Sequence, residues 1–545
     1  MVKNIFSLLA TRQTSILSGA TVIMFTVILS KVLGLVRDRL LTHLFSPDNI
    51  SIFFAAFGIP DLIFQLLIFG ALAVAFIPVF TEYSEKKGPG EAFKLAGSIL
   101  NIALIILSVA IVIVLIFIDP LTGLIAPGFS ESQKLQTISL TKVILIGQLL
   151  LVIGSLFSGV LQSFQRFIIP AMAGVVYNLG IILGITLLSP SMGIMGAAVG
   201  VVIGAALHFL IQLPMILSVG FKPKYLLSLF HPGVKEIMGL MSIRSLGLAA
   251  ELFNDRVAVA LASLISVQSV TYLTLAQHLQ LVPISLFGAT IAQAALPILS
   301  SEKARGRIEE YKITLLTTLH QVLFLALPAT AILIVLRIPS VRLTFGASQF
   351  DWEATVLTGQ TLAFMSIGLS GQAISLLLVR AFYALKDTKT PVIASFITVA
   401  VNVTLSIYFV RVLNLPIWGL GLAFSISSIL SALILFTALH FKIGRFNLEM
   451  ALVPFFKMLI STVIMGVCLY IPIKLLDAVI FDTTRTINLL VLTGLSSIFA
   501  LSIYVFLVWF LKVRELGTYI ELLKRMSKIQ TLIKSEEIIK ETKTV

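Results

Sequence analysis

Apolar segments long enough to cross a bilayer recur along the whole 545-residue chain, and this feature limits its fold more than any other. A spanning helix needs about 20 mostly apolar residues, and by that criterion we predict about fourteen. Of all residues, 58% are hydrophobic and 12% charged, and the mean hydropathy is +1.06, unlike soluble globular proteins. The sequence therefore predicts an all-α polytopic membrane protein. The predicted helices lie near residues 15–42, 50–81, 95–118, 137–163, 168–189, 193–217, 234–264, 268–299, 313–336, 354–382, 391–410, 416–441, 450–473 and 487–511.

The net charge of +14 could suggest a nucleic-acid partner, but its distribution along the chain fits a membrane protein better. Cytoplasmic loops of membrane proteins carry an excess of lysine and arginine. With a cytoplasmic N-terminus, most basic residues before the tail fall in the inside loops. We therefore expect both termini in the cytoplasm and no nucleic-acid partner. The outside loops then carry only Lys134, Arg337, Arg342, Arg411, Lys474 and Arg485.

The residue types that usually form catalytic, metal or nucleotide sites are sparse or scattered. The chain has one cysteine, Cys468, so we predict no disulfide framework. The six histidines lack metal-ligand spacing, and no glycine-rich phosphate loop with a lysine is present. We expect no enzymatic activity, no metal centre and no cofactor, and ATP is not the direct energy source. The first helix serves as the targeting signal, since no cleavable signal peptide is evident.

One pattern occurs in both halves of the chain. A helix, a short turn, a helix with proline near its start and a glycine-led helix appear around Pro170 and Gly196, and again around Pro391 and Gly419. The prolines are 221 residues apart and the glycines 223. The two units are six helices apart, so they share one orientation and are related by a pseudo-two-fold axis along the membrane normal. Two such lobes predict a central cavity and alternating access.

Four charged residues interrupt the first apolar helix: Lys31, Arg37, Asp38 and Arg39. A charge at the centre of a membrane helix costs about 2.5–3.5 kcal/mol on insertion scales, so such residues usually face a protein interior or a water-filled cavity. We interpret this cluster as the main functional candidate. The alternative is that the four side chains pair with one another near a membrane interface.

Several motifs resemble one family. Residues 30–39, 53–62, 75–83 and 379–392 are similar to the MurJ (MviN) family of lipid II flippases in the multidrug/oligosaccharidyl-lipid/polysaccharide exporter superfamily, and a weaker similarity extends through 294–300. The resemblance implies two six-helix lobes and two further helices that form a groove for a lipid tail. We assign an N-lobe to 1–217, a C-lobe to 218–442, the helix pair to 443–511 and a cytoplasmic tail to 512–545. The lysine-rich amphipathic tail either lies on an anionic membrane face or is solvated and frayed.

The resemblance also implies a function in a bacterial inner membrane. The implied substrate is lipid II, the undecaprenyl-pyrophosphate-linked peptidoglycan precursor, carried from the inner to the outer leaflet for cell-wall biogenesis. Cell-wall synthesis proteins are the implied protein partners. A pyrophosphate needs cations in a cavity of reduced dielectric, and arginine offers a planar bidentate donor set.

Three residues of the charged stretch match family positions. Arg37 matches an essential cavity arginine, Lys31 occupies the position of another, and Asp38 follows Arg37 as the family's own aspartate does. Other positions depart from the family pattern, because usual charges are missing in the second helix and in the eighth, where His278 stands at the position of an arginine. The departing positions are Ser51, Phe64, Gln65, Phe69 and the Gln277-His278 pair.

The seventh helix offers substitutes for the missing charges. Arg244, Glu251 and Asp255 lie on one helical face, with Arg256 beside them. We take Arg244, Arg256 and His278 as secondary headgroup contacts. The resemblance implies a sodium site that Asp255 and Asn402 match, although Ser406 replaces a second aspartate. The alternative is a stripe of ion pairs that locks helices together. The membrane potential, with Na⁺ or H⁺, is the expected coupling.

Two other functions remain open at the level of sequence. The charge-poor positions 51, 64, 65 and 69 favour another polyprenyl-linked glycan or an amphipathic compound as the exported substrate. A scaffold that keeps the fold without transport is the second alternative. The scaffold predicts that Arg37 can be replaced without effect, whereas both transport functions predict a loss.

Overall fold

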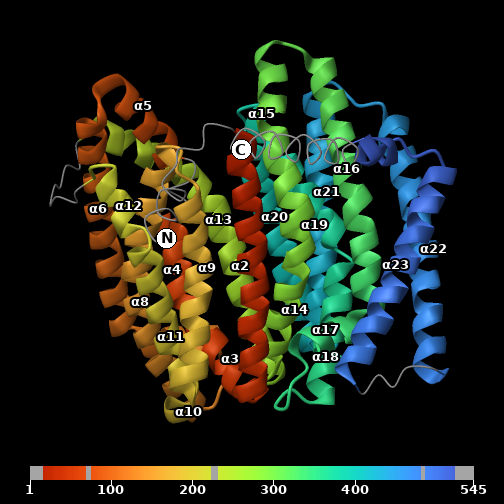
Figure 1. The fold of residues 1–545 in the computed structure, drawn as a ribbon, viewed down its shortest axis with the longest axis horizontal. Helices are drawn as coiled ribbons and strands as arrows, with labels where there is room; N and C mark the ends of the chain where they lie inside the picture. Colours follow the sequence, from red (N-terminus) through yellow and green to blue (C-terminus); the bar gives the residue numbers. More distant parts are fainter. Residues whose placement is uncertain (1–15, 69–74, 222–230, 480–484, 522–545) are drawn as a thin grey trace, which may run out of the picture. The chain divides into compact units, whose positions relative to one another are not determined.

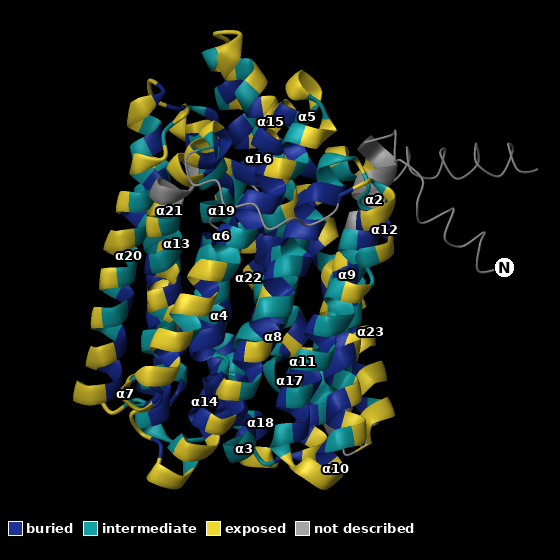
Figure 2. Ribbon diagram, turned by 90° about the vertical axis from the view of Figure 1, so that its left-hand side faces the viewer, coloured by how far each residue is buried: buried dark blue, intermediate teal, exposed yellow. Residues whose placement is uncertain are grey.

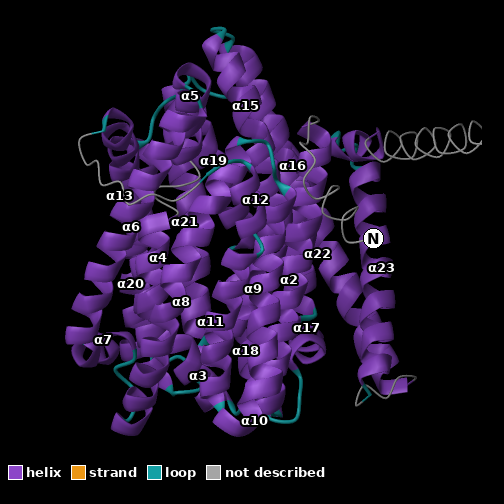
Figure 3. Cartoon of the chain, turned by 60° about the vertical axis from the view of Figure 1, so that its left-hand side comes forward, coloured by secondary structure: helices purple, strands orange, loops and turns teal. Residues whose placement is uncertain are grey.

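The computed structural model describes residues 16–68, 75–221, 231–479 and 485–521, and within these ranges it contains helices and no strand (Figure 3). The predicted all-α class is confirmed. In chain order the α-helices are α2 (Ile16–Leu44), α3 (Pro47–Ala56), α4 (Gly58–Ile68), α5 (Ile77–Lys87), α6 (Pro89–Ile116), α7 (Ile118–Ile125), α8 (Glu131–Ser163), α9 (Ile168–Leu183), α10 (Ser189–Met192), α11 (Ile194–Leu210), α12 (Leu213–Ser218), α13 (Pro232–Ile265), α14 (Ser269–Pro283), α15 (Thr290–Ala304), α16 (Ile308–Val335), α17 (Arg337–Phe345), α18 (Trp352–Ser366), α19 (Leu369–Ala384), α20 (Lys389–Ile407), α21 (Trp418–Lys442), α22 (Leu448–Val479) and α23 (Thr486–Phe510). Three π-helical segments, η2 (Gly184–Leu188), η3 (Ile284–Ala289) and η4 (Tyr408–Val412), continue α9, α14 and α20.

Among the described residues, eleven helical segments are long and apolar enough to cross a membrane, or twelve if α18 and α19, bent by 46°, form one span. The predicted number of about fourteen is not confirmed by this count. α2 and α13 are not in the count, although they are 29 and 34 residues long, and both carry several charged residues. The eleven segments are Pro47–Leu67, Pro89–Ile116, Glu131–Ser163, Ile168–Met192, Ile194–Ser218, Ser269–Ala304, Ile308–Val335, Lys389–Val412, Trp418–Lys442, Leu448–Leu475 and Thr486–Phe510.

The chain forms two compact units. The first runs to Leu279 and also includes Ser340–Met365 and Pro391–Ser427. The second comprises Gln280–Pro339, Ser366–Thr390 and the chain from Ser428 onward. The lobe boundaries at residues 217 and 442 stay a prediction. The charged stretch of α2 belongs to the first unit, and the α22–α23 pair belongs to the second.

The turns before Pro170 and Pro391 have the same local structure. Gln165 and Lys386 both adopt φ = 58°, the left-handed conformation that ends a helix. In each turn the next residue closes the helix with a backbone bond of 3.0 Å, from Arg166 N to the Leu161 carbonyl and from Asp387 N to the Phe382 carbonyl. The sequence similarity between the two halves therefore corresponds to a repeated backbone structure.

Glycines bring α9 and α11 into close contact. A Cβ added to Gly180 would lie 2.3 Å from the Gly204 Cα, and one added to Gly184 would lie 2.3 Å from the Gly200 Cα. These separations are far below van der Waals contact, so only glycine, which has no Cβ, fits at these positions. α9 and α11 run side by side in the first unit (Figure 1).

Asp387 caps the start of α20. Its Oδ1 accepts hydrogen bonds from the backbone N–H groups of Lys389 (3.0 Å) and Thr390 (3.1 Å), and its Oδ2 accepts from the Thr390 hydroxyl (2.6 Å) and from the Lys442 ammonium. Burial alone would raise the pKa of the Asp387 carboxyl, but hydrogen bonds from Lys442 and Thr390 lower it to about 2. The ionised form of Asp387 therefore stabilises the folded protein.

We expect Asp387→Ala to lower the free energy of unfolding at pH 7 by about 1 kcal/mol, the usual cost of a lost helix cap. Because the folded pKa lies below the unfolded value of about 3.9, the stabilisation is present above pH 4 and is lost as the pH falls toward 2. Thermal unfolding of the purified protein and the variant across pH 7 to 2 measures the effect. Asp387→Asn keeps an acceptor and should lose less. A difference that stays constant down to pH 2 would contradict this assignment.

Candidate functional site

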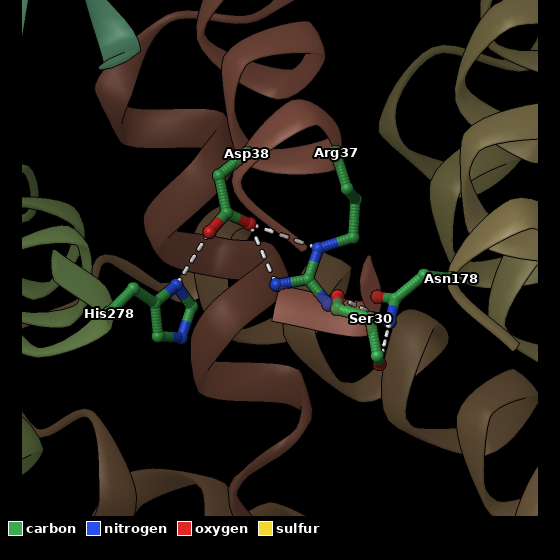
Figure 4. A network of polar contacts seen from close by, with 5 residues as sticks. All are labelled: Ser30, Arg37, Asp38, Asn178 and His278. Carbon is green, nitrogen blue, oxygen red and sulfur yellow. Dashed lines mark hydrogen bonds and ion pairs between the residues drawn. The ribbon is translucent and has the colours of Figure 1, made fainter. Parts of the chain in front are cut away.

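The charged stretch of α2 forms a buried network with α14. The Asp38 side chain is only 1% exposed, and its Oδ1 accepts two hydrogen bonds from Arg37, from Nε at 2.9 Å and from Nη2 at 2.7 Å. The second carboxylate oxygen, Oδ2, lies 2.7 Å from His278 Nδ1. Figure 4 shows Asp38 between Arg37 and His278. The structure thus joins three residues that the sequence proposed, two of them 240 positions apart.

This network orients the Arg37 guanidinium. A guanidinium has five N–H donors, of which two are directed at Asp38 here. The Arg37 side chain is 19% exposed, so it remains accessible to a ligand, whereas its partner carboxylate is buried. His278 also packs edge-to-face against Phe54, with ring centroids 5.8 Å apart. The arrangement offers an anionic ligand a cation held in one orientation.

The other two charged residues of the stretch, Arg39 and Lys31, lie in different surroundings. Arg39 Nη1 donates to the backbone carbonyls of Leu343 (2.8 Å) and Thr344 (3.4 Å) in α17. Arg39 therefore links α2 to α17, which fits a structural role. The Lys31 side chain is exposed.

On α13, Arg256 lies close to Asp61 of α4. Its Nη2 lies 3.7 Å from Asp61 Oδ2 in α4, and the same oxygen accepts a hydrogen bond of 2.6 Å from Gln65. The Arg256 Nε is buried without a hydrogen-bond partner. Gln65, one of the departures, thus serves as a partner of Asp61. The side chain of Arg244 lies outside the described residues.

Of the two predicted sodium-site residues, Asn402 pairs with Asn254 and not with Asp255. Asn402 is 5% exposed, and its Nδ2 donates to Asn254 Oδ1 at 2.8 Å, while its own Oδ1 is buried without a hydrogen-bond partner. The Asp255 side chain is exposed. Within the described ranges no group of three or more His, Cys, Asp or Glu residues could hold a metal ion.

Sequence reasoning missed Asn254, although the repeat contains a signal for it. In the first half, Asn178 Nδ2 donates a hydrogen bond of 3.2 Å to Ser30 Oγ, and the two residues are 148 positions apart (Figure 4). Asn402 and Asn254 are also 148 positions apart. An asparagine from the proline-started helix therefore meets a polar residue of the first helix in each half. Aligning the repeats around Asn178 would have pointed to Asn254.

The N-terminal ends of α3 and α14 meet through residues that occupy corresponding positions in the two sequence repeats. Ser51 Oγ lies 2.8 Å from Thr271 Oγ1, and Gln268 Nε2 donates to Asp48 Oδ2 at 3.1 Å. Both pairs are 220 positions apart, as expected where a two-fold axis brings residues against their own counterparts.

These contacts explain one departure from the family pattern. Ser51 and Thr271 are both 0% exposed. A carboxylate at position 51 would be costly to bury without a cation, whereas the serine hydroxyl is satisfied by Thr271. Phe64 packs against a core cluster of the first unit, and Gln277 is half-buried. Phe69 lies outside the described residues.

Comparisons with known proteins agree with this architecture. The family model "Lipid II flippase MurJ" matches residues 42–502. The lipid II flippase MurJ of Burkholderia cenocepacia is 27% identical over 445 residues, which cover 80% of this chain and 85% of that protein. The probable lipid II flippase MurJ of Bdellovibrio bacteriovorus is 26% identical over 490 residues, covering 88% of this chain and 92% of that protein.

Two solved structures share the fold. A lipid II flippase MurJ in an inward closed conformation superposes with a TM-score of 0.73 at 24% identity, covering 88% of this chain and 98% of that chain. An inward-facing multidrug resistance MATE family transporter of the MOP superfamily gives 0.64 at 16% identity, covering 76% of this chain and 94% of that chain. Because the family model spans most of the sequence and the fold agrees with it, this chain belongs to the lipid II flippase MurJ family.

Proposed function

We propose that this protein carries lipid II from the inner to the outer leaflet of a bacterial inner membrane. The observation that supports the proposal most directly is the Arg37–Asp38–His278 network between α2 and α14 of a MurJ family member. A buried carboxylate that orients a partly exposed guanidinium suits recognition of a pyrophosphate, because arginine binds phosphate oxygens with paired, charge-assisted hydrogen bonds. We assign no catalytic step, since a flippase moves its substrate without changing covalent bonds.

We infer that Arg37 is the main headgroup contact. The pyrophosphate would take the N–H groups of Arg37 that do not face Asp38, and the Asp38 carboxylate would keep the guanidinium from turning away. Lys31, Arg256 and His278 would add positive charge, and Arg244 stays a secondary candidate. This set would replace the charges that the resemblance leads us to expect in the second predicted helix.

Alternating access would require the contacts between α3 and α14 to open. If the positive-inside distribution gives the orientation, these N-terminal ends lie on the outer side and both chain termini are cytoplasmic. The Ser51–Thr271 and Asp48–Gln268 pairs would then close the outer side while the substrate loads from the cytoplasm. Both pairs are uncharged or singly charged hydrogen bonds, which can exchange for water during opening.

The membrane potential is our proposed driving force, since moving one charge across it yields about 2.3 kcal/mol per 100 mV. Na⁺ or H⁺ would couple to it. Hard cations take oxygen ligands, and the buried, unpartnered Asn402 Oδ1 is an oxygen that Na⁺ could use. Asp255 would be the carboxylate, since it follows Asn254, the hydrogen-bond partner of Asn402, in the sequence. Cell-wall synthesis proteins are the proposed protein partners.

Rescue of a flippase-depleted bacterium tests the proposal. We expect this gene to restore growth and to make lipid II accessible on the outer leaflet. Membrane fractionation and a C-terminal tag would confirm expression and insertion. Accessible lipid II without this gene would show another flippase at work, and a well-inserted protein that leaves lipid II inaccessible would contradict lipid II as the substrate.

A further inference from the structure

The second compact unit contains a cavity of about 480 Å³ formed by α16, the start of α22 and the segment after α23. We propose that this cavity binds the headgroup of an anionic glycerophospholipid from the surrounding bilayer. The residues that carry the argument are three cations, a buried histidine–glutamate pair and exposed apolar side chains at the rim. The cavity residues include none of the proposed headgroup contacts of the transported substrate.

The end of α23 gathers the cations. Lys512 adopts φ = 54°, its N–H donates to the Trp509 carbonyl (3.0 Å), and the Val513 N–H donates to the Val508 carbonyl (2.9 Å). This turn ends the helix, buries Val513 and leaves Lys512 and Arg514 exposed at the cavity. From α22, the Lys457 ammonium reaches the Leu511 carbonyl at 2.9 Å. One ammonium donor is used there, and two remain for a ligand.

The carboxylates of the cavity do not cancel this charge. Glu515 is 6% exposed, and its Oε1 lies 3.2 Å from His320 Nδ1. The other ring nitrogen, His320 Nε2, lies 3.0 Å from the Ala451 carbonyl, which only accepts, so Nε2 carries a proton. The contact between Nδ1 and Oε1 requires one further proton. If that proton is on Nδ1, the charges of the imidazolium and the carboxylate cancel, and if it is on Oε1, both groups are neutral, so the pair has no net charge in either case. Glu449 alone then opposes Lys457, Lys512 and Arg514.

The rim of the cavity is apolar and adjoins the lipid-facing surface. Ile313, Met450 and Val453 line the cavity and are 57%, 51% and 44% exposed. Exposed apolar residues continue along α22 and α23, and in a membrane protein such surfaces contact acyl chains. Figure 2 shows exposed positions along α23. Trp509 and Phe510, near the end of α23, are exposed, and aromatic residues are enriched where a membrane helix meets the lipid headgroups. Cations beside an acyl-chain surface favour a lipid over a soluble anion.

Thermal unfolding of the full-length protein in a neutral detergent, titrated with short-chain phosphatidylglycerol, tests the site. We expect this lipid to raise the melting temperature with a saturating dose response, because a ligand that binds only the folded state stabilises it. Lys512→Gln should weaken the apparent affinity about tenfold, and the combined Lys457→Gln, Lys512→Gln and Arg514→Gln protein should lose the response. Lys474→Gln is the matched control, since Lys474 is an exposed lysine of α22 that does not line the cavity.

Other outcomes overturn the proposal. An equal response to short-chain phosphatidylcholine would mean that net headgroup charge is not recognised, and an equal response to inorganic phosphate would mean that the ligand is a soluble anion. If Arg37→Ala also abolishes the phosphatidylglycerol response, the lipid binds at the transport residues instead. If the triple variant does not fold, an unchanged affinity in both Lys512→Gln and Arg514→Gln would refute the site, because both side chains are exposed.

Discussion

Arg37→Ala should abolish transport while the protein still inserts in the membrane. The change removes the one guanidinium that Asp38 orients and that remains accessible to a ligand. In the complex, the charge pair that is lost is the one between Arg37 and the pyrophosphate. Truncating one partner of such a buried, hydrogen-bonded pair costs about 2–5 kcal/mol, which corresponds to a loss of roughly 30-fold to several thousandfold in affinity for the substrate. Growth of a flippase-depleted strain and accessibility of lipid II on the outer leaflet are the readouts.

Two control variants separate the loss of a contact from the loss of the fold. Arg411→Ala removes an exposed arginine of η4 and should support growth like the wild type. Arg37→Lys keeps the charge next to Asp38 but loses the planar paired donors, so it should retain the fold and only part of the activity. Normal rescue by a well-inserted Arg37→Ala protein would contradict the role of Arg37 and favour a non-transporting scaffold.

Gly184→Leu should prevent α9 and α11 from packing. A Cβ at this position would lie 2.3 Å from the Gly200 Cα and 2.7 Å from the Gly196 carbonyl oxygen, both backbone atoms that no side-chain rotation can move. Overpacking costs about 1–3 kcal/mol where side chains can adjust, and we expect about 3 kcal/mol or more at a backbone contact. The readouts are the yield of monodisperse protein and its melting temperature.

Gly494→Leu is the matched control for that substitution. Gly494 lies in α23, and a Cβ there meets no heavy atom within 4 Å, so the same change should leave the yield and the melting temperature close to those of the wild type. Equal behaviour of the two variants would show that the α9–α11 contact tolerates separation.

Local patterns in the sequence were sufficient for the all-α membrane class and for part of the site. High hydropathy over about 20 residues indicates a spanning helix, because a segment in lipid must form all its backbone hydrogen bonds internally and expose apolar side chains. The same reasoning singles out Arg37 and Asp38, since charges on an apolar helix are costly.

Only the tertiary structure decided which of these residues meet. His278 and Asp38 are 240 positions apart, and Ser51 and Thr271 are 220 apart, so no local period connects them. The sequence left open whether Arg39 faces a cavity or a membrane interface, and its contacts with Leu343 and Thr344 give it a structural role. Hydropathy and spacing report the environment of one helix at a time, whereas these contacts depend on how helices distant in the sequence pack together, because that packing determines whether a buried polar group finds its partner.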